Sequence, residues 1–177
     1  MLKVFDLRCE YAANPLGIGT TTPRLSWKLE HAERDQRQTA YQIVAAHAAE
    51  HLDADASHPL WDSGKVASAE SVAVPYGGPP LRSRERVYWR VRGWDARDRP
   101  SPWSETAWFE TALLQPRDWS ATWIGYPPAW PGRALYFRRQ FHLEQPPSRA
   151  RLYVCGLGYH ELYVNGMRLG DAVLDPA

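Results

Sequence analysis

Short runs in which every second side chain is large and apolar are the feature that most constrains the fold of this chain. Residues 25–29 and 87–92 show this alternation clearly. A period of two is typical of β-strands that bury one face. Turn-forming sequences separate the runs, and they are Asn14-Pro15, Thr22-Pro23, Asp62-Ser63-Gly64, Gly77-Gly78-Pro79-Pro80 and Arg99-Pro100-Ser101-Pro102. About five or six short strands in about 110 residues predict an antiparallel β-sandwich.

The alternation also indicates where the tryptophans of this segment lie. Trp27 and Trp89 alternate with polar neighbours, so we expect both in the core between two sheets. Arg90 and Arg92 occupy the other face of the second strand, and Trp103 follows later in the chain. Because guanidinium groups stack on indole faces, these three residues predict a cation–π ladder with a structural role.

Residues 45–55 are the place where a helix competes with a strand, because they are rich in alanine. They have neither a clear cap nor a sustained apolar stripe. We therefore expect a strand that ends near Ala48, followed by a polar loop to Pro59. His47 and His51 have the spacing of two metal ligands on a helix, but no further ligand accompanies them. The sequence thus predicts no metal site and no cofactor.

A domain boundary is predicted near residues 112–120, where the alternation stops and a proline appears. We assign residues 1–113 to the β-sandwich and residues 114–177 to a second domain. Strand patterns resume in that domain at residues 135–141, 151–155 and 161–169. Within the last of these, the pair Asn165-Gly166 suits a two-residue type I′ hairpin turn.

The second domain is expected to be incomplete. About four strands in about 60 residues provide too little sheet for a closed sandwich. They would leave an apolar face and a strand edge uncovered, which favours association. We therefore expect the natural protein to continue beyond residue 177, and we expect residues 121–177 to be the less stable part of the chain.

Charge and composition argue against several classes of partner. Lys plus Arg number 21 and Asp plus Glu number 20, so the net charge is +1 and neither nucleic acid nor a membrane is expected as a partner. No apolar run approaches the ~18 residues of a membrane span. Cys9 and Cys155 lie far apart, which predicts two reduced thiols. The residues Met1 to Asp6 lack the pattern of a secretory signal, so we expect a cytoplasmic protein.

Several stretches, taken in their order and spacing, resemble a known family. They include Thr22-Pro23-Arg24-Leu25-Ser26-Trp27, Leu60-Trp61-Asp62-Ser63-Gly64, Tyr88-Trp89-Arg90-Val91-Arg92, Ala121-Thr122-Trp123-Ile124-Gly125 and Gly156-Leu157-Gly158-Tyr159-His160-Glu161-Leu162-Tyr163-Val164-Asn165-Gly166. Together they resemble the N-terminal region of bacterial α-L-rhamnosidases of glycoside hydrolase family 78. This resemblance implies an all-β chain, with a fibronectin type III-like β-sandwich followed by the truncated start of a galactose-binding-like jelly roll.

The resemblance also implies that no catalytic residue lies in this chain. Family members act by inversion, with paired carboxylates in an (α/α)6 barrel far downstream, and nothing here matches that barrel. Glu30, Glu33 and Asp35 cluster with arginines in a polar loop, which indicates a solvated surface rather than a catalytic pair. We therefore expect the chain alone to be inactive, although its parent looks like a glycoside hydrolase.

Tryptophans beyond the boundary are candidates for carbohydrate binding. Trp123 and Trp130, together with Trp119, would suit stacking on a sugar face, although packing against neighbouring domains is the more common role. Asp171 suits a sugar or calcium contact, with an ordinary turn role as the alternative. The sites predicted as tentative carbohydrate contacts are Trp123, Trp130 and Asp171.

Two functions of different classes fit these observations. The first is a non-catalytic N-terminal scaffold, with a carbohydrate-binding surface, of an enzyme that hydrolyses terminal α-L-rhamnose. Its partners would be the remainder of the parent enzyme and rhamnosides. The alternative is a free-standing fibronectin-like binding or adhesion module unrelated to hydrolysis.

Overall fold

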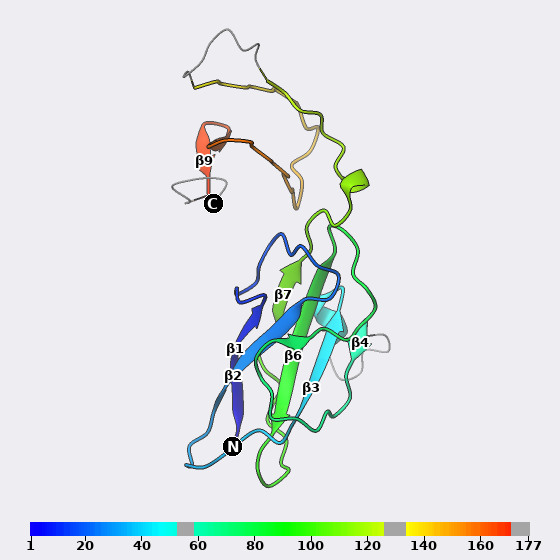
Figure 1. Cartoon of the computed structure of the whole chain (residues 1–177), viewed down its shortest axis with the longest axis vertical. Helices are drawn as coiled ribbons and strands as arrows, with labels where there is room; N and C mark the ends of the chain where they lie inside the picture. Colours follow the sequence, from blue (N-terminus) through cyan, green and yellow to red (C-terminus); the bar gives the residue numbers. More distant parts are fainter. Residues whose placement is uncertain (53–58, 126–133, 171–177) are drawn as a thin grey trace. The chain divides into compact units, whose positions relative to one another are not determined.

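The structure is a computed structural model that describes residues 1–52, 59–125 and 134–170 (Figure 1). It divides into two compact units, which we call the N-terminal unit (Met1–Trp123) and the C-terminal unit (Ile124–Ala177). The sheets of both units consist of antiparallel strand pairs, so the all-β fold class predicted from the alternation is confirmed. The predicted boundary between residues 113 and 114 stays a prediction.

Among its described residues, the N-terminal unit has two sheets, with the strand orders β1-β2-β5 and β4-β3-β6-β7 (Figure 1). The strands are β1 (Lys3–Cys9), β2 (Arg24–Glu30), β3 (Ala40–Ala46), β4 (Trp61–Asp62), β5 (Val74–Pro75), β6 (Arg86–Trp94) and β7 (Ala107–Glu110). Two short 3-10 helices accompany them, η1 (Ala49–Leu52) and η2 (Pro116–Asp118). The two sheets enclose one main core, which makes this unit a β-sandwich.

The core lies between the sheets and is built from the alternating apolar positions. From one sheet, β2 contributes Leu25 and Trp27, and from the other, β6 contributes Val87, Trp89 and Val91. Trp27 is 2% exposed and Trp89 is 1% exposed. Both tryptophans are therefore core residues, as the alternation predicts.

β3 departs from the one-sided pattern, because side chains on both of its faces are buried. The helix η1 follows the strand and packs its buried leucine against Val44 and Ala46, away from the main core. This second, smaller cluster explains why residues 44–46 are apolar without alternation. The strand ends at Ala46, two residues before the predicted end. The predicted polar loop is wrong at residues 49–52, which form a 3-10 helix, and its residues 53–58 lie outside the described residues.

The C-terminal unit contains a β-hairpin, formed by β8 (Leu162–Val164) and β9 (Met167–Leu169). The residues between the strands are Asn165, with a φ of 50°, and Gly166, with a φ of 80°. Positive φ at both central positions is what a type I′ turn requires, and Asn and Gly adopt it at the lowest steric cost. The predicted hairpin and its turn are confirmed.

Two other strand predictions in this unit are wrong. Residues 135–141 and 151–155 belong to no strand, although the structure describes both stretches. Most of their large apolar side chains are exposed, and the exposed fraction of Tyr136 reaches 97%. A strand needs a neighbour to satisfy its backbone N–H and C=O groups. Neither stretch has such a neighbour within the described ranges, so the alternation remains without a sheet.

Candidate functional site

The residues predicted to bind carbohydrate do not form a site that the structure describes. Trp123 is 66% exposed at the end of the N-terminal unit, whereas Trp119 is half-buried. Trp130 and Asp171 lie outside the described residues. An exposed indole has the shape to cover an apolar ligand face. Trp123 therefore keeps the surface that stacking requires, and its binding role stays a prediction.

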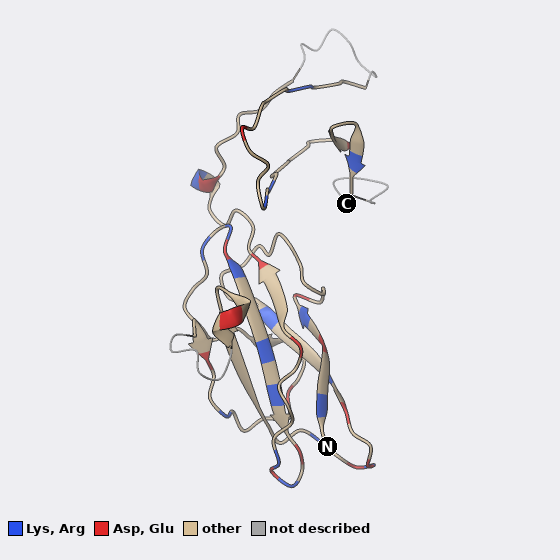
Figure 2. Ribbon diagram, turned by 180° about the vertical axis from the view of Figure 1, so that it is seen from behind, with Lys and Arg blue, Asp and Glu red and all other residues tan. Residues whose placement is uncertain are grey.

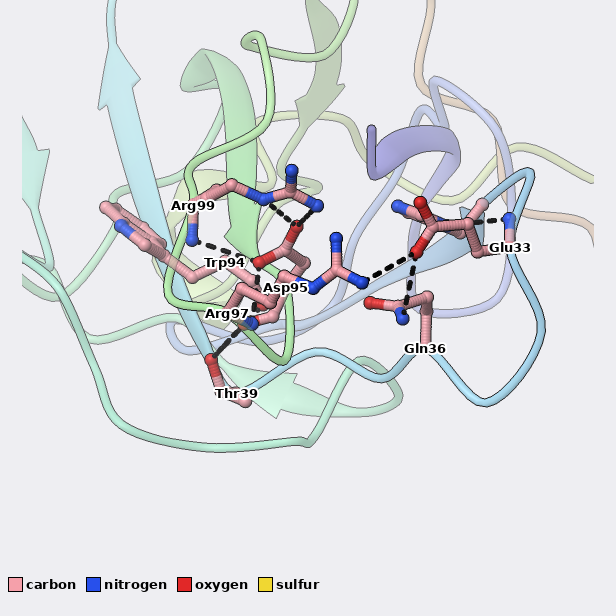
Figure 3. Close-up of polar contacts among 8 residues, drawn as sticks. Glu33, Gln36, Thr39, Trp94, Asp95, Arg97 and Arg99 are labelled. Carbon is pink, nitrogen blue, oxygen red and sulfur yellow. Dashed lines mark hydrogen bonds and ion pairs between the residues drawn. The ribbon is translucent and has the colours of Figure 1, made fainter.

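A buried carboxylate organises the turn after β6 (Figure 3). Asp95 is 1% exposed, and its Oδ1 accepts the backbone N–H groups of Arg97 at 2.9 Å and of Arg99 at 3.0 Å. The Arg99 guanidinium binds the other oxygen, with Nη2 2.8 Å from Oδ2. The Asp95 carbonyl accepts the Thr39 hydroxyl at 2.9 Å. These bonds tie the turn to the segment that precedes β3.

The protonation of Asp95 follows from these contacts. Hydrogen bonding from the Arg99 backbone, opposed by burial and reinforced by the Arg99 side chain, lowers the pKa of Asp95 to about 2. A general acid in a glycosidase needs the opposite shift, toward neutral pH. Asp95 is therefore a structural anion that holds the turn, and not a proton donor.

Two surface carboxylates are shifted in the same direction. Lys28 Nζ lies 2.7 Å from Asp6 Oδ2, and this hydrogen bond lowers the pKa of Asp6. Arg24 Nη2 lies 2.7 Å from Glu10 Oε2, and this contact lowers the pKa of Glu10. In both cases a neighbouring cation stabilises the carboxylate. A lowered pKa keeps each carboxyl group ionised, so it can form an ion pair but is a poor proton donor for acid catalysis.

β6 and β7 share a further ion pair that is nearly buried. Arg86 Nε lies 3.0 Å from Glu110 Oε2, and the two residues are direct partners in the antiparallel register. The Arg86 guanidinium also lies over Trp108, 4.0 Å from the ring centroid. A buried charge needs such a partner, because an unpaired one would be strongly destabilising. The role of Glu110 is therefore structural, because it neutralises Arg86 where β6 packs against β7.

A ladder of cations and indole rings covers one face of β6. The side chain of Arg92 lies between two rings, with Cζ 4.6 Å from the Trp103 centroid and 5.0 Å from the Trp94 centroid. Arg90 lies over Trp103 at 4.9 Å, and Lys65 lies over Trp94 at 5.0 Å. Figure 2 shows the blue arginine bands that recur along this long strand. The predicted ladder is confirmed, and it extends to Trp94 and Lys65.

A surface depression of about 510 Å³ borders the loop between β5 and β6. Its lining residues are His47, Leu60, Pro79, Pro80, Arg82, Ser83 and Glu85. Within it, His47 Nε2 lies 3.5 Å from Glu85 Oε1. The described lining residues include prolines, an ion pair and a hydroxyl group, and Glu85 is the one carboxylate among them. These described residues therefore do not form the carboxylate pair that a glycosidase uses.

Neither thiol chemistry nor metal binding emerges from the described part of the chain. Both cysteines are free, and burial raises the pKa of the Cys9 thiol to about 12, which makes it a poor nucleophile. The described ranges contain no group of three His, Cys, Asp or Glu residues that could hold a metal ion. In the same ranges, no helix has the length and apolar character needed to cross a membrane.

Comparison with known proteins identifies the family. Residues 4–115 match the family described as Rha78A-like, N-terminal immunoglobulin domain. The chain belongs to this family. Residues 145–177 match a second family, the alpha-L-rhamnosidase N-terminal domain. Immunoglobulin and fibronectin type III domains share the sandwich architecture, so the family agrees with the fold predicted from the alternation.

The curated relatives are α-L-rhamnosidases. The protein from Streptomyces avermitilis is 48% identical over 127 residues, which cover 71% of this chain and 12% of the relative. One from Formosa agariphila is 38% identical over 173 residues, which cover 92% of this chain and 18% of the relative. The chain spans between 12% and 20% of the length of the curated relatives it matches. The resemblance to the N-terminal region of α-L-rhamnosidases is confirmed.

Solved structures agree with these relatives. The Streptomyces avermitilis α-L-rhamnosidase complexed with L-rhamnose aligns with a TM-score of 0.67 at 48% identity, covering 72% of this chain and 12% of that protein. The α-L-rhamnosidase from Dictyoglumus thermophilum aligns with a TM-score of 0.65 at 40% identity, covering 71% of this chain and 14% of that protein. The N-terminal unit therefore has a fold found in α-L-rhamnosidases.

Sequence reasoning missed the structural role of Asp95, although a local signal was present. An aspartate followed by a polar stretch and a proline, as in Asp95-Ala96-Arg97-Asp98-Arg99-Pro100, is typical of a turn in which the carboxylate accepts nearby N–H groups. The buried position of that carboxylate had no local signal. The bond between the Thr39 hydroxyl and the Asp95 backbone carbonyl likewise had no local signal, because Thr39 lies far away in the sequence.

Proposed function

We propose that this chain is the non-catalytic N-terminal part of an α-L-rhamnosidase, in which the sandwich acts as a scaffold for the rest of the enzyme. The observation that carries the proposal is the match of residues 4–115 and then 145–177 to N-terminal domain families. The relatives, which this chain covers only in part, are α-L-rhamnosidases. The parent enzyme would hydrolyse terminal α-L-rhamnose, and its remainder would be the partner of this chain.

The carboxylates of the N-terminal unit support a non-catalytic role. Inverting glycosidases use two carboxyl groups about 6.5–9.5 Å apart, one of them with a raised pKa. Among the described residues, the buried carboxylates are Asp95 and Glu110, and each contacts an arginine. An anion that is bound to an arginine is a poor proton donor and a weakened base.

The first experiment measures hydrolysis. The purified chain is incubated with an aryl α-L-rhamnoside, and the Streptomyces avermitilis enzyme serves as the positive control. We expect aglycone release at the rate of buffer alone, because the described carboxylates offer no acid and base pair. Turnover that rises in proportion to the chain's concentration, and that is lost on substitution of an Asp or Glu, would overturn the proposal.

The second experiment tests the scaffold role by exchange of domains. In the Streptomyces avermitilis relative, the matched segment is either deleted or replaced by the segment of this chain that aligns with it. The two chains are 48% identical over the 127 aligned residues. We expect the deletion to lose soluble, active enzyme and the chimera to recover it. A deletion variant with the yield, melting temperature and activity of the intact enzyme would contradict a scaffold role.

Carbohydrate binding at Trp123 is a separate part of the proposal, supported by the exposed indole. L-Rhamnose is titrated against the chain while the heat of binding is recorded by calorimetry, since substitution of Trp123 would remove a fluorescent reporter. We expect a saturable change that Trp123→Ala abolishes and Trp123→Phe retains, since phenylalanine keeps a ring face. Trp130→Ala and Asp171→Ala extend the test to the other candidates. A signal without saturation, or one unchanged in Trp123→Ala, would remove Trp123 from the site.

A further inference from the structure

After the end of β7, residues 111–119 remain hydrogen-bonded to the loop between β5 and β6. The backbone N–H of Thr111 donates to the Glu85 carbonyl at 2.9 Å. The backbone N–H of Arg84 donates to the Ala112 carbonyl at 3.1 Å. These bonds continue the contact between β6 and β7 past the ends of both strands. The segment that follows β7 is therefore held to the sandwich by backbone hydrogen bonds at its first residues.

Ser83 makes the next contact, and it uses both hydrogen-bonding functions of its hydroxyl group. Its Oγ accepts the backbone N–H of Leu114 at 2.7 Å. The same hydroxyl donates its proton to the carboxylate of Asp118. One proton and two lone pairs make these two bonds compatible. A single side chain of the sandwich thus contacts both ends of residues 114–118.

Asp118 makes further hydrogen bonds that hold the same segment. Its Oδ2 accepts the backbone N–H of Gln115 at 3.0 Å, which stabilises the 3-10 helix η2. The Asp118 carbonyl accepts the Arg84 guanidinium, with Nη2 at 2.9 Å. Hydrogen bonding from Ser83 is the main reason that the pKa of Asp118 is lowered, and the carboxylate is therefore the charged acceptor that these bonds require.

We propose that Ser83 and Asp118 form a clamp that makes residues 114–119 a rigid continuation of the sandwich. A flexible segment of this length would have a root-mean-square span of roughly 12–15 Å and would let its far end wander over that range. The clamp instead fixes the place at which the chain leaves the N-terminal unit. A fixed exit suits a module that must present the following chain in one position. The clamp rests on the contacts of Ser83 and Asp118 and is independent of the proposed rhamnosidase function.

Amide hydrogen exchange on the full chain tests the clamp. In the wild-type protein we expect the amides of Leu114 and Gln115 to be protected, because each donates to a clamp side chain. Ser83→Ala should raise their exchange rates by about tenfold or more, because it removes the acceptor of the Leu114 amide and leaves Asp118, the acceptor of the Gln115 amide, without its hydrogen bond from Ser83. Asp118→Asn keeps the size of the side chain but removes the charge, and it should raise the exchange rate at Gln115.

Ser120→Ala is the matched control, because it removes the same hydroxyl from an exposed serine in the same stretch. It should leave the exchange at Leu114 unchanged. Protection of residues 87–94 reports whether a variant still folds, and if Ser83→Ala loses it, Asp118→Asn carries the test. Unprotected amides at Leu114 and Gln115 in the wild-type chain would overturn the clamp. Rates left unchanged by the Ser83 and Asp118 variants would also overturn it.

Cleavage by trypsin gives a second readout, because Arg117 lies exposed inside the clamped segment. A bond in an ordered segment must open before a protease can cut it. We expect Ser83→Ala to accelerate cleavage after Arg117, measured against cleavage after the exposed Arg139 of the C-terminal unit. An equal ratio of the two cuts in the wild-type and variant chains would show that Ser83 does not hold the segment closed, and it would overturn the clamp.

Discussion

The two units carry the same kind of apolar alternation, and it has opposite results in them. In the N-terminal unit, Trp27 and Trp89 reach one core from two different sheets. In the C-terminal unit, Tyr136 is 97% exposed and Leu152 is 60% exposed. Burial needs a second layer, and residues 1–123 supply one while the described C-terminal residues do not. An alternating pattern is therefore necessary for a buried strand but not sufficient.

Backbone hydrogen bonding differs between the units as strongly as burial does. The strand β6 has neighbours on both sides, β3 and β7, whereas β8 pairs only with β9 among the described residues. A central strand is protected by both neighbours, while an isolated hairpin is at best marginally stable in water. The contrast makes the N-terminal unit the part of the chain that should fold independently.

Amide exchange should show the largest difference between the units. We expect the amides of residues 87–94 to exchange at least about a thousandfold more slowly than those of residues 162–169, because the former open only with the whole sandwich. The rates are measured on the full chain by mass spectrometry or NMR. Equal protection in a monomer would mean that the C-terminal unit has a complete sheet, and the comparison would fail.

A matched pair of aromatic truncations should show the next largest effect. Trp89→Ala should lower the free energy of unfolding of the N-terminal unit by about 3–5 kcal/mol, the usual range for a buried aromatic residue. Tyr136→Ala should change it by no more than about 0.5 kcal/mol, because that side chain is exposed. Denaturant unfolding measures both. A loss below about 1 kcal/mol for Trp89→Ala would contradict its place in the core.

The ladder on β6 should contribute less than the core. Trp103→Ala should cost about 1–2 kcal/mol, because it removes contacts with two arginines that are each worth about 0.5–1 kcal/mol at partly exposed sites. Trp103→Phe keeps a ring face and should recover part of this loss. Unfolding in denaturant distinguishes the three proteins. If the wild type, Trp103→Ala and Trp103→Phe had the same free energy of unfolding, the stacking of the arginines on Trp103 would contribute no stability.

The pH dependence of Asp95 should be the smallest of these effects. Its pKa of about 2 in the folded chain lies below the ordinary value of 3.8, so the unfolded state takes up the proton first as the pH falls. The stabilisation is complete above about pH 5 and is lost as the pH falls toward 2. The difference in unfolding free energy between the wild type and Asp95→Asn should shrink over that range.

Asp98→Asn is the control for this measurement, because Asp98 is exposed in the same turn. Asp98→Asn should change the stability less than Asp95→Asn does at neutral pH. The ion pair that it removes, between Asp98 and Lys65, is exposed and contributes little. Because asparagine keeps one acceptor oxygen for the turn, the loss in Asp95→Asn is itself expected to be modest. A difference that is the same at pH 6 and pH 2 would contradict the ionised, hydrogen-bonded role of Asp95.

Local sequence signals predicted a large part of the fold. Alternation identified the faces of β2 and β6, the Asn165-Gly166 pair identified the hairpin turn, and the spacing of Arg90 and Arg92 identified the ladder. Each of these features depends on residues that are close together in sequence or on the period of one strand. The candidate carbohydrate site was harder to predict, because exposed tryptophans have no period that separates binding from packing.

The amino-acid sequence by itself determined the strands β2 and β6 of the N-terminal unit and the faces of both that turn inward, because these properties follow from side-chain alternation. Only the tertiary structure decided that both faces of β3 are covered and that residues 135–141 have no strand partner. It also decided that Ser83 meets Asp118, a residue 35 positions later in the chain. Such contacts depend on which distant segments the fold brings together, and they cannot be predicted from local periodicity.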